Sequence, residues 1–407
     1  MAIDFGTTKL AIIIAHETRE YIKIETVQSF PYPSDMQWDS WEYMDIAPIL
    51  TEAVLSFKDI IGAESVRTIL GVPGYYTGIL ENSCTIDIDG GVVTPYHISK
   101  AIEACGKYPL PDEWSILQVI PRVYGVDGQS QVYTPTDMRG DSLMVSSSLV
   151  CINQKFISRI TEELTKLGIH VDHVRPALLS SGNVFLTELE RKNGGILIDI
   201  GGKSTDIIIY RDGIPIYTEW LPVGGSNITS DLSIGMDIPF KQAEELKRQC
   251  VLDFYKSSDE KQGQLNMPLK IGEMIKDIPL NYMQEIVELR VKEIFELIVE
   301  RIDSQNVIDR EVCNAVLIGG GLAPIRGAKD FASAHIGCGN LRIGQPNLDN
   351  ISNVMTLAST YALIGEQAMD VTSESVEYED KTNRLTDDEH TNIKDRIKRW
   401  LSSFFNK

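Results

Sequence analysis

The stretch from Ile196 to Tyr210 constrains the fold of this chain more than any other. It reads ILIDIGGKSTDIIIY, so two runs rich in β-branched residues flank a turn that contains Gly201 and Gly202. This pattern predicts a hairpin of buried strands with the carboxylate of Asp199 at the turn. Adjacent glycines let backbone N–H groups approach an oxyanion closely, and Asp199 suits a magnesium shell completed by waters and phosphates. A plain core hairpin is the alternative interpretation of this stretch taken alone.

The N-terminus repeats this design. Residues 2–14 read AIDFGTTKLAIII, which is an apolar strand, Asp4, one intervening residue, Gly6, a polar turn and a second apolar strand. Two such hairpins roughly two hundred residues apart indicate a duplicated core that clamps phosphates between its halves. The Asp-Phe-Gly triplet also occurs in protein kinases, but this chain lacks the His-Arg-Asp catalytic loop that accompanies it there.

A third element completes the set. Residues 315–325 read AVLIGGGLAPI, a strand that runs into a triple-glycine turn. The three elements in this order resemble the actin-like ATPase superfamily, which implies ATP and magnesium between two lobes, with Asp4 and Asp199 holding the metal through water. The resemblance assigns nucleotide binding to the first phosphate loop at Asp4, Gly6, Thr7, Thr8 and Lys9, to the second at Asp199, Gly201, Gly202, Lys203, Ser204 and Thr205, and to the adenosine turn at Gly319, Gly320 and Gly321.

Two further segments match the same superfamily. The pair Gly224 and Gly225 resembles its extra turn beside the terminal phosphates. Residues 243–248 read AEELKR and resemble the segment where an acidic and a basic side chain flank the nucleoside, which here would be Glu244 and Lys247. A surface ion pair at i,i+3 on a helix is the alternative interpretation of that pair.

The sequence argues against fast hydrolysis. Relatives often place a polar residue that orients the attacking water where this chain has Arg175 or Pro176. Arginine stays protonated and cannot act as a base. Whether the protein is an enzyme stays open at this stage, and we expect at most a slow ATPase.

Length, charge and cysteine usage exclude several classes of protein. The chain has 407 residues, enough for one to three domains, and a net charge of −20, which argues against a general nucleic-acid binder. The six cysteines show no C-x-x-C spacing, so we interpret them as reduced core residues. The sequence has no signal peptide and no run of eighteen apolar residues, so we expect no membrane-spanning segment.

The region from Gly74 to Ile152 narrows the family. Its pattern predicts a strand, a short helix and two strands, with no obvious catalytic set. Within it, Pro-Asp-Glu at 111–113 and VIPRVYGVDG at 119–128 resemble the bacterial FtsA family, whose members replace the usual small subdomain 1B with their own subdomain 1C. The resemblance runs from Ile3 to about Gly365.

The fold class implied is α/β, an actin-like two-lobe ATPase fold with a duplicated nucleotide-binding core and an inserted subdomain. In the second small subdomain, apolar residues from Ile286 to Ile302, Leu289 among them, predict a long helix with a broad core face. The implied divisions are subdomain 1A at 1–73 and 153–192, subdomain 1C at 74–152, subdomain 2A at 193–230 and 305–369, subdomain 2B at 231–304, an acidic flexible linker at 370–391, and an amphipathic membrane-targeting helix at 392–407.

The final sixteen residues have their own pattern. Six large apolar side chains recur at spacings of three and four and share one helical face, and five basic residues accompany them against one acid. A basic amphipathic helix with Trp and Phe is typical of binding to an anionic membrane surface. A helix docked on the protein's own core is the alternative. The six residues are Ile393, Ile397, Trp400, Leu401, Phe404 and Phe405.

The family resemblance implies a function. An FtsA-like protein would bind ATP with magnesium, self-associate into protofilaments, and tether the C-terminal peptide of the tubulin-like protein FtsZ, through subdomain 2B, to the cytoplasmic face of the cell membrane at the division site. Two alternatives remain. A PilM-like adaptor of type IV pilus assembly resembles both lobes and the inserted module, although the C-terminal helix favours FtsA. A small-molecule kinase shares the ATP core, but the sequence offers no distinct catalytic acid or base.

Overall fold

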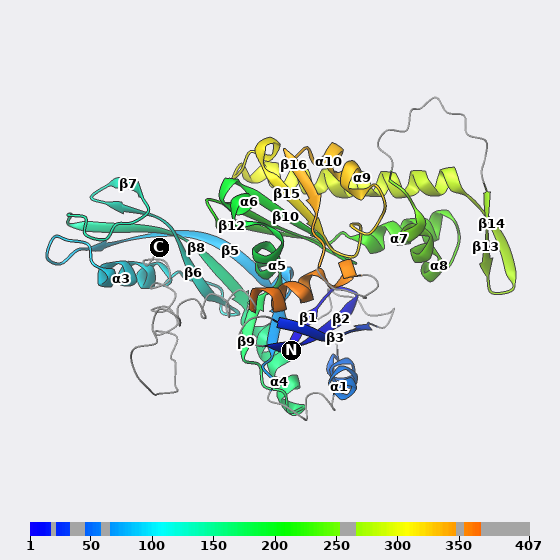
Figure 1. Cartoon of the computed structure of the whole chain (residues 1–407), viewed down its shortest axis with the longest axis horizontal. Helices are drawn as coiled ribbons and strands as arrows, with labels where there is room; N and C mark the ends of the chain where they lie inside the picture. The colour runs from blue at the N-terminus through cyan, green and yellow to red at the C-terminus, as the bar shows by residue number, and fades with distance from the viewer. Residues whose placement is uncertain (18–21, 33–44, 58–65, 253–265, 347–353, 368–407) are drawn as a thin grey trace.

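Two five-stranded sheets with the same topology form the framework of the two lobes (Figure 1). The computed structural model describes residues 1–17, 22–32, 45–57, 66–252, 266–346 and 354–367. The first sheet has the order β3-β2-β1-β4-β9 and the second the order β12-β11-β10-β15-β16. In each sheet three strands form an antiparallel meander. A fourth strand pairs in parallel with the first strand of the meander, and a fifth pairs in parallel with the fourth. The predicted duplication of the core and the predicted fold class are therefore confirmed.

The strands β1 and β4 at the centre of the first sheet are short and apolar. All four residues of β1 and of β4 are buried, as expected for strands covered on both faces. The first sheet consists of β1 (Ala2–Phe5), β2 (Lys9–Glu17), β3 (Ile22–Pro31), β4 (Ile69–Val72) and β9 (His173–Pro176). The second consists of β10 (Gly195–Ile200), β11 (Thr205–Arg211), β12 (Ile214–Leu221), β15 (Asn314–Ile318) and β16 (Asn340–Ile343).

Helices pack on the outer face of each sheet and between the two sheets. Side chains of α1 and α4 share a core with the first sheet, and those of α7 to α10 share one with the second. Two helices lie between the sheets, α5 and the helix over residues 358–367. Apolar side chains of α5 share a core with the second sheet, and those of the helix over 358–367 share cores with both sheets. The helices are α1 (Ala47–Ser56), α4 (Gln154–Lys166), α5 (Ala177–Phe185), α6 (Glu188–Asn193), α7 (Gly225–Gly235), α8 (Phe240–Gln249), α9 (Leu280–Gln305) and α10 (Ala328–Ile336).

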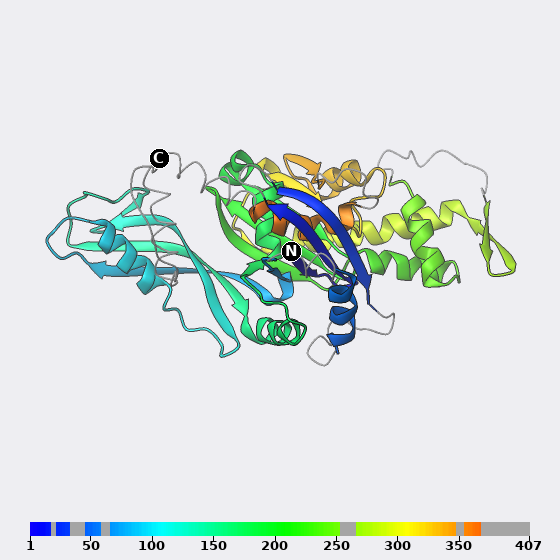
Figure 2. The ribbon, with the colours of Figure 1, turned by 60° about the horizontal axis from the view of Figure 1, so that its bottom comes forward.

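Two smaller units lie at opposite ends of the molecule (Figures 1 and 2). One is a four-stranded antiparallel sheet of order β5-β8-β6-β7 with α3 packed against it, and it contains a short strand, β7, that the sequence did not predict. The other is the hairpin β13–β14 at the far end of α9. Their bounds are β5 (Thr77–Asp87), α3 (Pro95–Cys105), β6 (Trp114–Val126), β7 (Gln129–Val132), β8 (Ser142–Asn153), β13 (Asn266–Ile271) and β14 (Met274–Pro279).

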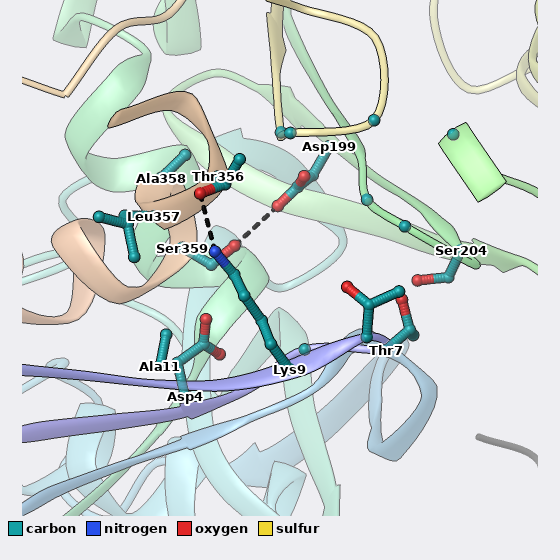
Figure 3. A pocket seen from close by; sticks show the side chains of 18 of the residues that line it. Asp4, Thr7, Lys9, Ala11, Asp199, Ser204, Thr356, Leu357, Ala358 and Ser359 are labelled. Atoms are coloured by element: carbon teal, nitrogen blue, oxygen red, sulfur yellow. Dashed lines mark hydrogen bonds between the residues drawn. The ribbon is translucent and has the colours of Figure 1, made fainter. Parts of the chain in front are cut away.

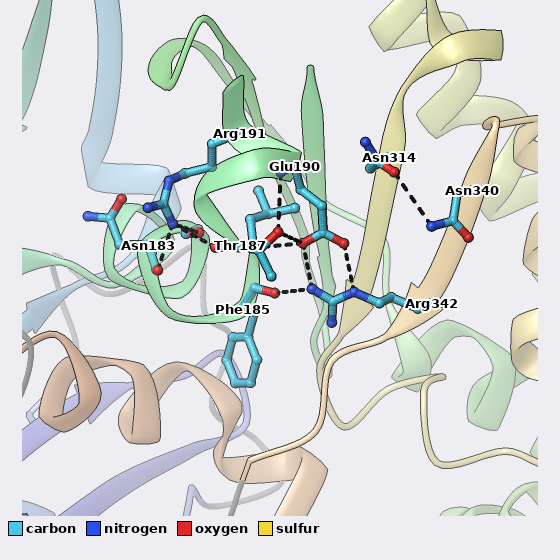
Figure 4. Close-up of polar contacts among 10 residues, drawn as sticks. Asn183, Phe185, Thr187, Glu190, Arg191, Asn314, Asn340 and Arg342 are labelled. Carbon is cyan, nitrogen blue, oxygen red and sulfur yellow. Dashed lines mark hydrogen bonds and ion pairs between the residues drawn. The ribbon is translucent and has the colours of Figure 1, made fainter. Parts of the chain in front are cut away.

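A polar network anchors α5 to the second lobe (Figure 4). Arg191 of α6 donates to the carbonyls of Asn183 and Leu186, at 2.8 and 2.6 Å, and so caps the end of α5. Beside it, Glu190 forms a bidentate pair with Arg342 of β16 at 2.7 and 2.8 Å. The hydrogen bonds from Arg342 lower the pKa of Glu190 to about 2.

One local prediction is wrong. Leu289 was assigned to the core face of α9, yet its side chain is 61% exposed. The buried face of α9 runs through Val287 and Val291, and a residue two positions after Val287 points to the opposite side of a helix.

The C-terminal predictions lie outside the described residues. The expected acidic linker at 370–391 and the membrane helix at 392–407, with its six apolar side chains, both fall after residue 367. Among the helices that the structure describes, none combines the length and the apolar character that crossing a membrane requires.

Candidate functional site

A cavity of about 690 Å³ opens between the two lobes (Figure 3). The turn after β1, the turn after β10 and the triple-glycine turn after β15 all line it. So do α8 and the short 3₁₀ helix η4 (Val354–Leu357). The volume falls in the usual range for small-molecule sites, roughly 300–1,000 Å³. The three elements that the sequence singled out, far apart along the chain, therefore surround one space.

The two hairpin turns have the same internal hydrogen bond. Gly6 donates its N–H to the carbonyl of Lys9 at 3.0 Å, and Gly201 donates to the carbonyl of Ser204 at 2.8 Å. The turns also touch each other, because the backbone N–H of Lys203 donates to Thr7 Oγ1 at 2.9 Å. The two predicted phosphate loops are therefore in direct contact, and both line the cavity.

The glycines of the second lobe stack on the second hairpin. Gly225 donates its N–H to the carbonyl of Gly201 at 2.9 Å, and Gly321 donates to the carbonyl of Ile200 at 2.8 Å. A Cβ on Gly321 would lie only 2.1 Å from the oxygen of Gly201, so no larger residue fits at that position. Gly319 has a φ of +94°, a left-handed conformation that favours glycine. The predicted glycine turns thus pack against one another as one layer of backbone in the wall of the cavity.

Three charged groups that the sequence predicted meet at the base of the cavity (Figure 3). They are Asp4 and Lys9 from the first hairpin and Asp199 from the second. Burial raises the pKa of Asp4 and of Asp199 to about 6, and it lowers the pKa of Lys9 to about 8. Burial therefore disfavours the charged form of each of these three groups. Shifted pKa values of this kind are common at functional sites.

Sequence analysis missed a third carboxylate. Asp206 lines the cavity directly opposite Asp199 in the β10–β11 ladder, and its Oδ1 is buried without a hydrogen-bond partner. Burial raises the pKa of Asp206 well above its usual range. The signal was available, because in a tight hairpin the residue seven positions after Asp199 faces it across the strands.

Glu244 and Lys247 lie in the second lobe beside the glycine layer. Lys247 is 3% exposed and lies 2.7 Å from Glu244, and it also donates to the carbonyl of Gly225 and to Thr229 Oγ1, both at 3.0 Å. The alternative interpretation is correct about the i,i+3 ion pair but wrong about its place on the surface, because Lys247 is buried and bonds the turn in the wall of the cavity. Arg248 lines the cavity next to this pair and was not predicted.

Some predicted residues support the site rather than face it. Thr205 is completely buried and donates its hydroxyl to the carbonyl of Val223 at 2.8 Å. Arg175, where a water-orienting residue was sought, pairs with Glu366 at 3.0 Å and donates to Gln367 at 2.9 Å, both on the helix over 358–367. Apolar Ala177 lines the cavity just after it in the chain.

The carboxylates do not make a complete metal site by themselves. Across the part of the chain that the structure describes, no three His, Cys, Asp or Glu side chains are grouped closely enough to hold a metal ion. The three carboxylates are still coupled electrostatically, because the charge of Asp199 helps to raise the pKa of Asp4, and the charges of Asp199 and Asp4 help to raise the pKa of Asp206. This arrangement fits an ion whose remaining ligands are water and phosphate, as magnesium prefers.

Two family models match the chain, and both describe one family. The model described as "Cell division protein FtsA" matches residues 196–362. The model described as "SHS2 domain inserted in FTSA" matches residues 74–151, which form the four-stranded sheet and α3 at one end of the molecule. Together they span more than half of the chain.

Curated relatives with the name "Cell division protein FtsA" match most of the chain. The protein of Bacillus subtilis (strain 168) is 25% identical over 350 residues, which are 85% of this chain and 78% of the relative. That of Neisseria meningitidis serogroup B is 26% identical over 343 residues, 81% and 80% of the two chains. That of Escherichia coli (strain K12) is 23% identical over 355 residues, 85% and 84%.

Solved structures agree on the fold. A chain of the "PilM-PilN type IV pilus biogenesis complex" has a TM-score of 0.59 at 14% identity and covers 91% of this chain and 97% of its own. MreB5 of Spiroplasma citri bound to ADP has a TM-score of 0.51 at 13% identity, with 92% and 97% covered. At such identities the likeness concerns the fold alone.

Proposed function

This chain belongs to the FtsA family of actin-like cell-division proteins, and on that premise we propose that it links nucleotide binding to assembly at the division site. It binds ATP with magnesium between its lobes, self-associates into protofilaments, and tethers FtsZ to the cytoplasmic face of the cell membrane. The observation that carries the nucleotide proposal is the cavity between the lobes, where three glycine turns surround Asp4, Lys9 and Asp199.

The residues of the cavity fit a magnesium nucleotide. The two hairpin turns present backbone N–H groups and Lys9 presents an ammonium group, both of which favour phosphate oxygens. Asp4, Asp199 and Asp206 would orient the water ligands of the ion. Magnesium, when bound, would neutralise part of the charge on the phosphates. Glu244 and Lys247 would hold the nucleoside end of the ligand, beside Gly225.

Hydrolysis should be slow or absent. Phosphoryl transfer to water requires a group that positions the nucleophile. Arg175 is engaged by Glu366, and Ala177, which lines the cavity nearby, has no polar side chain to offer. We infer that the nucleotide acts chiefly by favouring one arrangement of the lobes over another.

The decisive experiment measures nucleotide binding directly. A fluorescent ATP analogue is titrated into the full chain with excess magnesium and, separately, with EDTA. We expect saturable binding that is markedly stronger with magnesium. Absence of binding in both conditions would overturn the nucleotide proposal, and hydrolysis at the enzyme median of roughly 10 per second would overturn the proposal of slow turnover.

We propose that residues 392–407, whose sequence predicts an amphipathic helix, attach the chain to the membrane. Flotation with anionic vesicles compares the full chain, a truncation after Thr391, and Trp400→Glu, each with and without ATP. We expect flotation of the full chain only, strengthened by ATP because a polymer presents many tails at once, with avidity gains of about 10² or more. Equal flotation of all three proteins would rule out this helix as the anchor.

The surface for the FtsZ C-terminal peptide is proposed on the second small subdomain. Tyr282, Ile286 and Leu289 share one face of α9. Ile234 of α7 lies next to this face, because the side chain of Ile286 packs against the following residue, Gly235, where a Cβ would lie 2.5 Å from Ile286 Cδ1. Ile234 is 77% exposed, Leu289 61% and Tyr282 50%, so an apolar patch faces solvent. Exposed apolar patches of this kind mark interaction sites.

Binding of a labelled FtsZ C-terminal peptide tests this surface. Leu289→Glu and Ile234→Glu should each weaken binding by about 10-fold or more, as for interface residues near the centre of a contact. Val312→Glu is the matched control, since Val312 is 73% exposed on the second lobe. Unchanged affinity in both patch variants would place the peptide elsewhere.

A further inference from the structure

One helix contacts the carboxylates of both lobes. On the helix over residues 358–367, Ser359 donates its hydroxyl to Asp199 Oδ2 at 2.8 Å (Figure 3). Its neighbour Thr360 donates to Asp4 Oδ2 at 3.0 Å. Asp4 belongs to the first sheet and Asp199 to the second. Two adjacent hydroxyls therefore hold two acids that are about two hundred residues apart in the chain.

The other end of this helix is firmly anchored. Glu366 accepts hydrogen bonds from Ser180 at 2.5 Å and from Asn183 at 2.7 Å, both on α5, and it pairs with Arg175 of β9 at 3.0 Å. The hydroxyls at the cavity are thus mounted on an element that is fixed at its far end.

The body of the helix is packed on both sides. Leu363 and Ile364 share a core with the first sheet, whereas Ala358 and Ala362 share one with the second sheet and α5. Thr360 itself is completely buried. Because the helix lies between the two sheets, it sets how far the carboxylates of the two lobes stand from each other.

We propose that Ser359 and Thr360 are positioning residues that fix the separation and orientation of Asp199 and Asp4 for a magnesium nucleotide, an inference that rests on the proposed nucleotide binding. A hydrogen bond to the ionised form stabilises a buried carboxylate and restricts its rotation. Without the hydroxyls, each carboxylate would remain on its strand but would no longer be held in a fixed orientation toward the acid of the other lobe. The hydroxyls act through the carboxylates and need no contact with the nucleotide.

The test compares nucleotide binding with and without magnesium in full-length variants. Ser359→Ala and Thr360→Val remove one hydroxyl each, and Thr360→Ser keeps the hydroxyl. Ser181→Ala is the matched control, because Ser181 is also completely buried but donates only to a helix carbonyl, that of Ala177 at 2.9 Å. The probe is a fluorescent ATP analogue, titrated in EDTA and then across a magnesium series. Circular dichroism and thermal unfolding verify that each variant is folded.

We expect the first two variants to bind the probe in EDTA within about twofold of wild type. The magnesium midpoint should rise by about 10- to 100-fold, the usual cost of losing a group that orients a metal ligand. Thr360→Ser and Ser181→Ala should stay near wild type. The inference fails if Ser359→Ala and Thr360→Val keep the wild-type magnesium midpoint, or if they lose binding equally with and without magnesium. If wild type itself binds no probe, it is the proposed function that fails.

Discussion

The two phosphate hairpins share a backbone but differ in charge. Asp4 pairs with Ala11 across the first hairpin, and Asp199 pairs with Asp206 across the second, at the same register. In both hairpins the pairing partner comes seven residues later in the sequence. The repeat therefore preserves the first acid and replaces a methyl group by a second carboxylate.

The position five residues after the first acid differs as well. In the first hairpin it holds Lys9, whose ammonium donates to Thr356 Oγ1 at 2.7 Å, and in the second it holds Ser204. The first hairpin thus lines the cavity with one acid and one cation, whereas the second lines it with two acids, because its own Lys203 is not among the lining residues. The difference teaches that the second hairpin offers no cation of its own to the cavity beside its two acids, a charge that a magnesium ion would supply.

The largest expected effect comes from removing the acid of the second hairpin that stands at the same position as Asp4 in the first. Asp199→Ala takes away a carboxylate of the proposed magnesium shell, so we expect magnesium-dependent ATP affinity to fall by on the order of 100-fold. Isothermal titration calorimetry in magnesium and in EDTA measures both affinities. Equal ATP affinity of mutant and wild type would show that the second hairpin is not the magnesium side of the site.

Asp206→Ala makes the second hairpin resemble the first. The variant removes a buried, unpartnered carboxylate oxygen, so the nucleotide-free protein should gain about 1–3 kcal/mol in unfolding free energy. The stabilisation added by magnesium ATP should shrink in the same variant. Urea denaturation with and without the ligand measures both changes. A loss of stability in the nucleotide-free variant would contradict the comparison.

Lys9→Met removes the cation that distinguishes the first hairpin. Because Lys9 would contribute one charge-assisted contact to phosphate, we expect ATP affinity to fall by about 10-fold. In contrast with the variant at Asp199, this loss should be the same in magnesium and in EDTA. A loss seen only with magnesium would assign Lys9 to the metal rather than to the phosphates.

The comparison also shows why most of the fold followed from sequence. The hairpins at Asp4 and Asp199 and the turn at Gly319 are local patterns, in which a strand, an acid and a glycine stand within a few residues. Such patterns predict their own backbone, and three of them in order predict the duplicated core.

What the sequence did not predict depends on contacts between distant segments. Ser359 and Thr360 matter because of the acids they meet across the fold, and no local pattern distinguishes them from other small helical residues. Leu289 looked like core because its helix is apolar, and only tertiary packing decides which face is covered. Asp206 could have been found from the hairpin register alone.

The smallest expected effect is on the pH dependence of stability, which should differ between Asp4 in the cavity and Glu190 in its ion pair with Arg342. Burial raises the pKa of Asp4 from 3.8 to about 6, so its contribution to stability is present below about pH 3.8 and is lost as the pH rises through 6. Glu190 has the opposite sign, because Arg342 lowers its pKa from 4.5 to about 2, so its contribution to stability is present above about pH 4.5 and is lost as the pH falls from there through about 2.

Urea denaturation from pH 4.5 to 7 in EDTA therefore compares wild type with Asp4→Asn and with Glu190→Gln. The stability of wild type relative to Asp4→Asn should fall as the pH rises, by less than about 1.4 kcal/mol per pH unit, the limit for one proton. Its stability relative to Glu190→Gln should stay level over that range. Excess magnesium ATP should flatten the first slope, because a nearby cation favours the ionised carboxylate. A slope that persists with the ligand bound would mean that Asp4 lies outside the reach of the ion, and the first hairpin would then contribute only its backbone and Lys9.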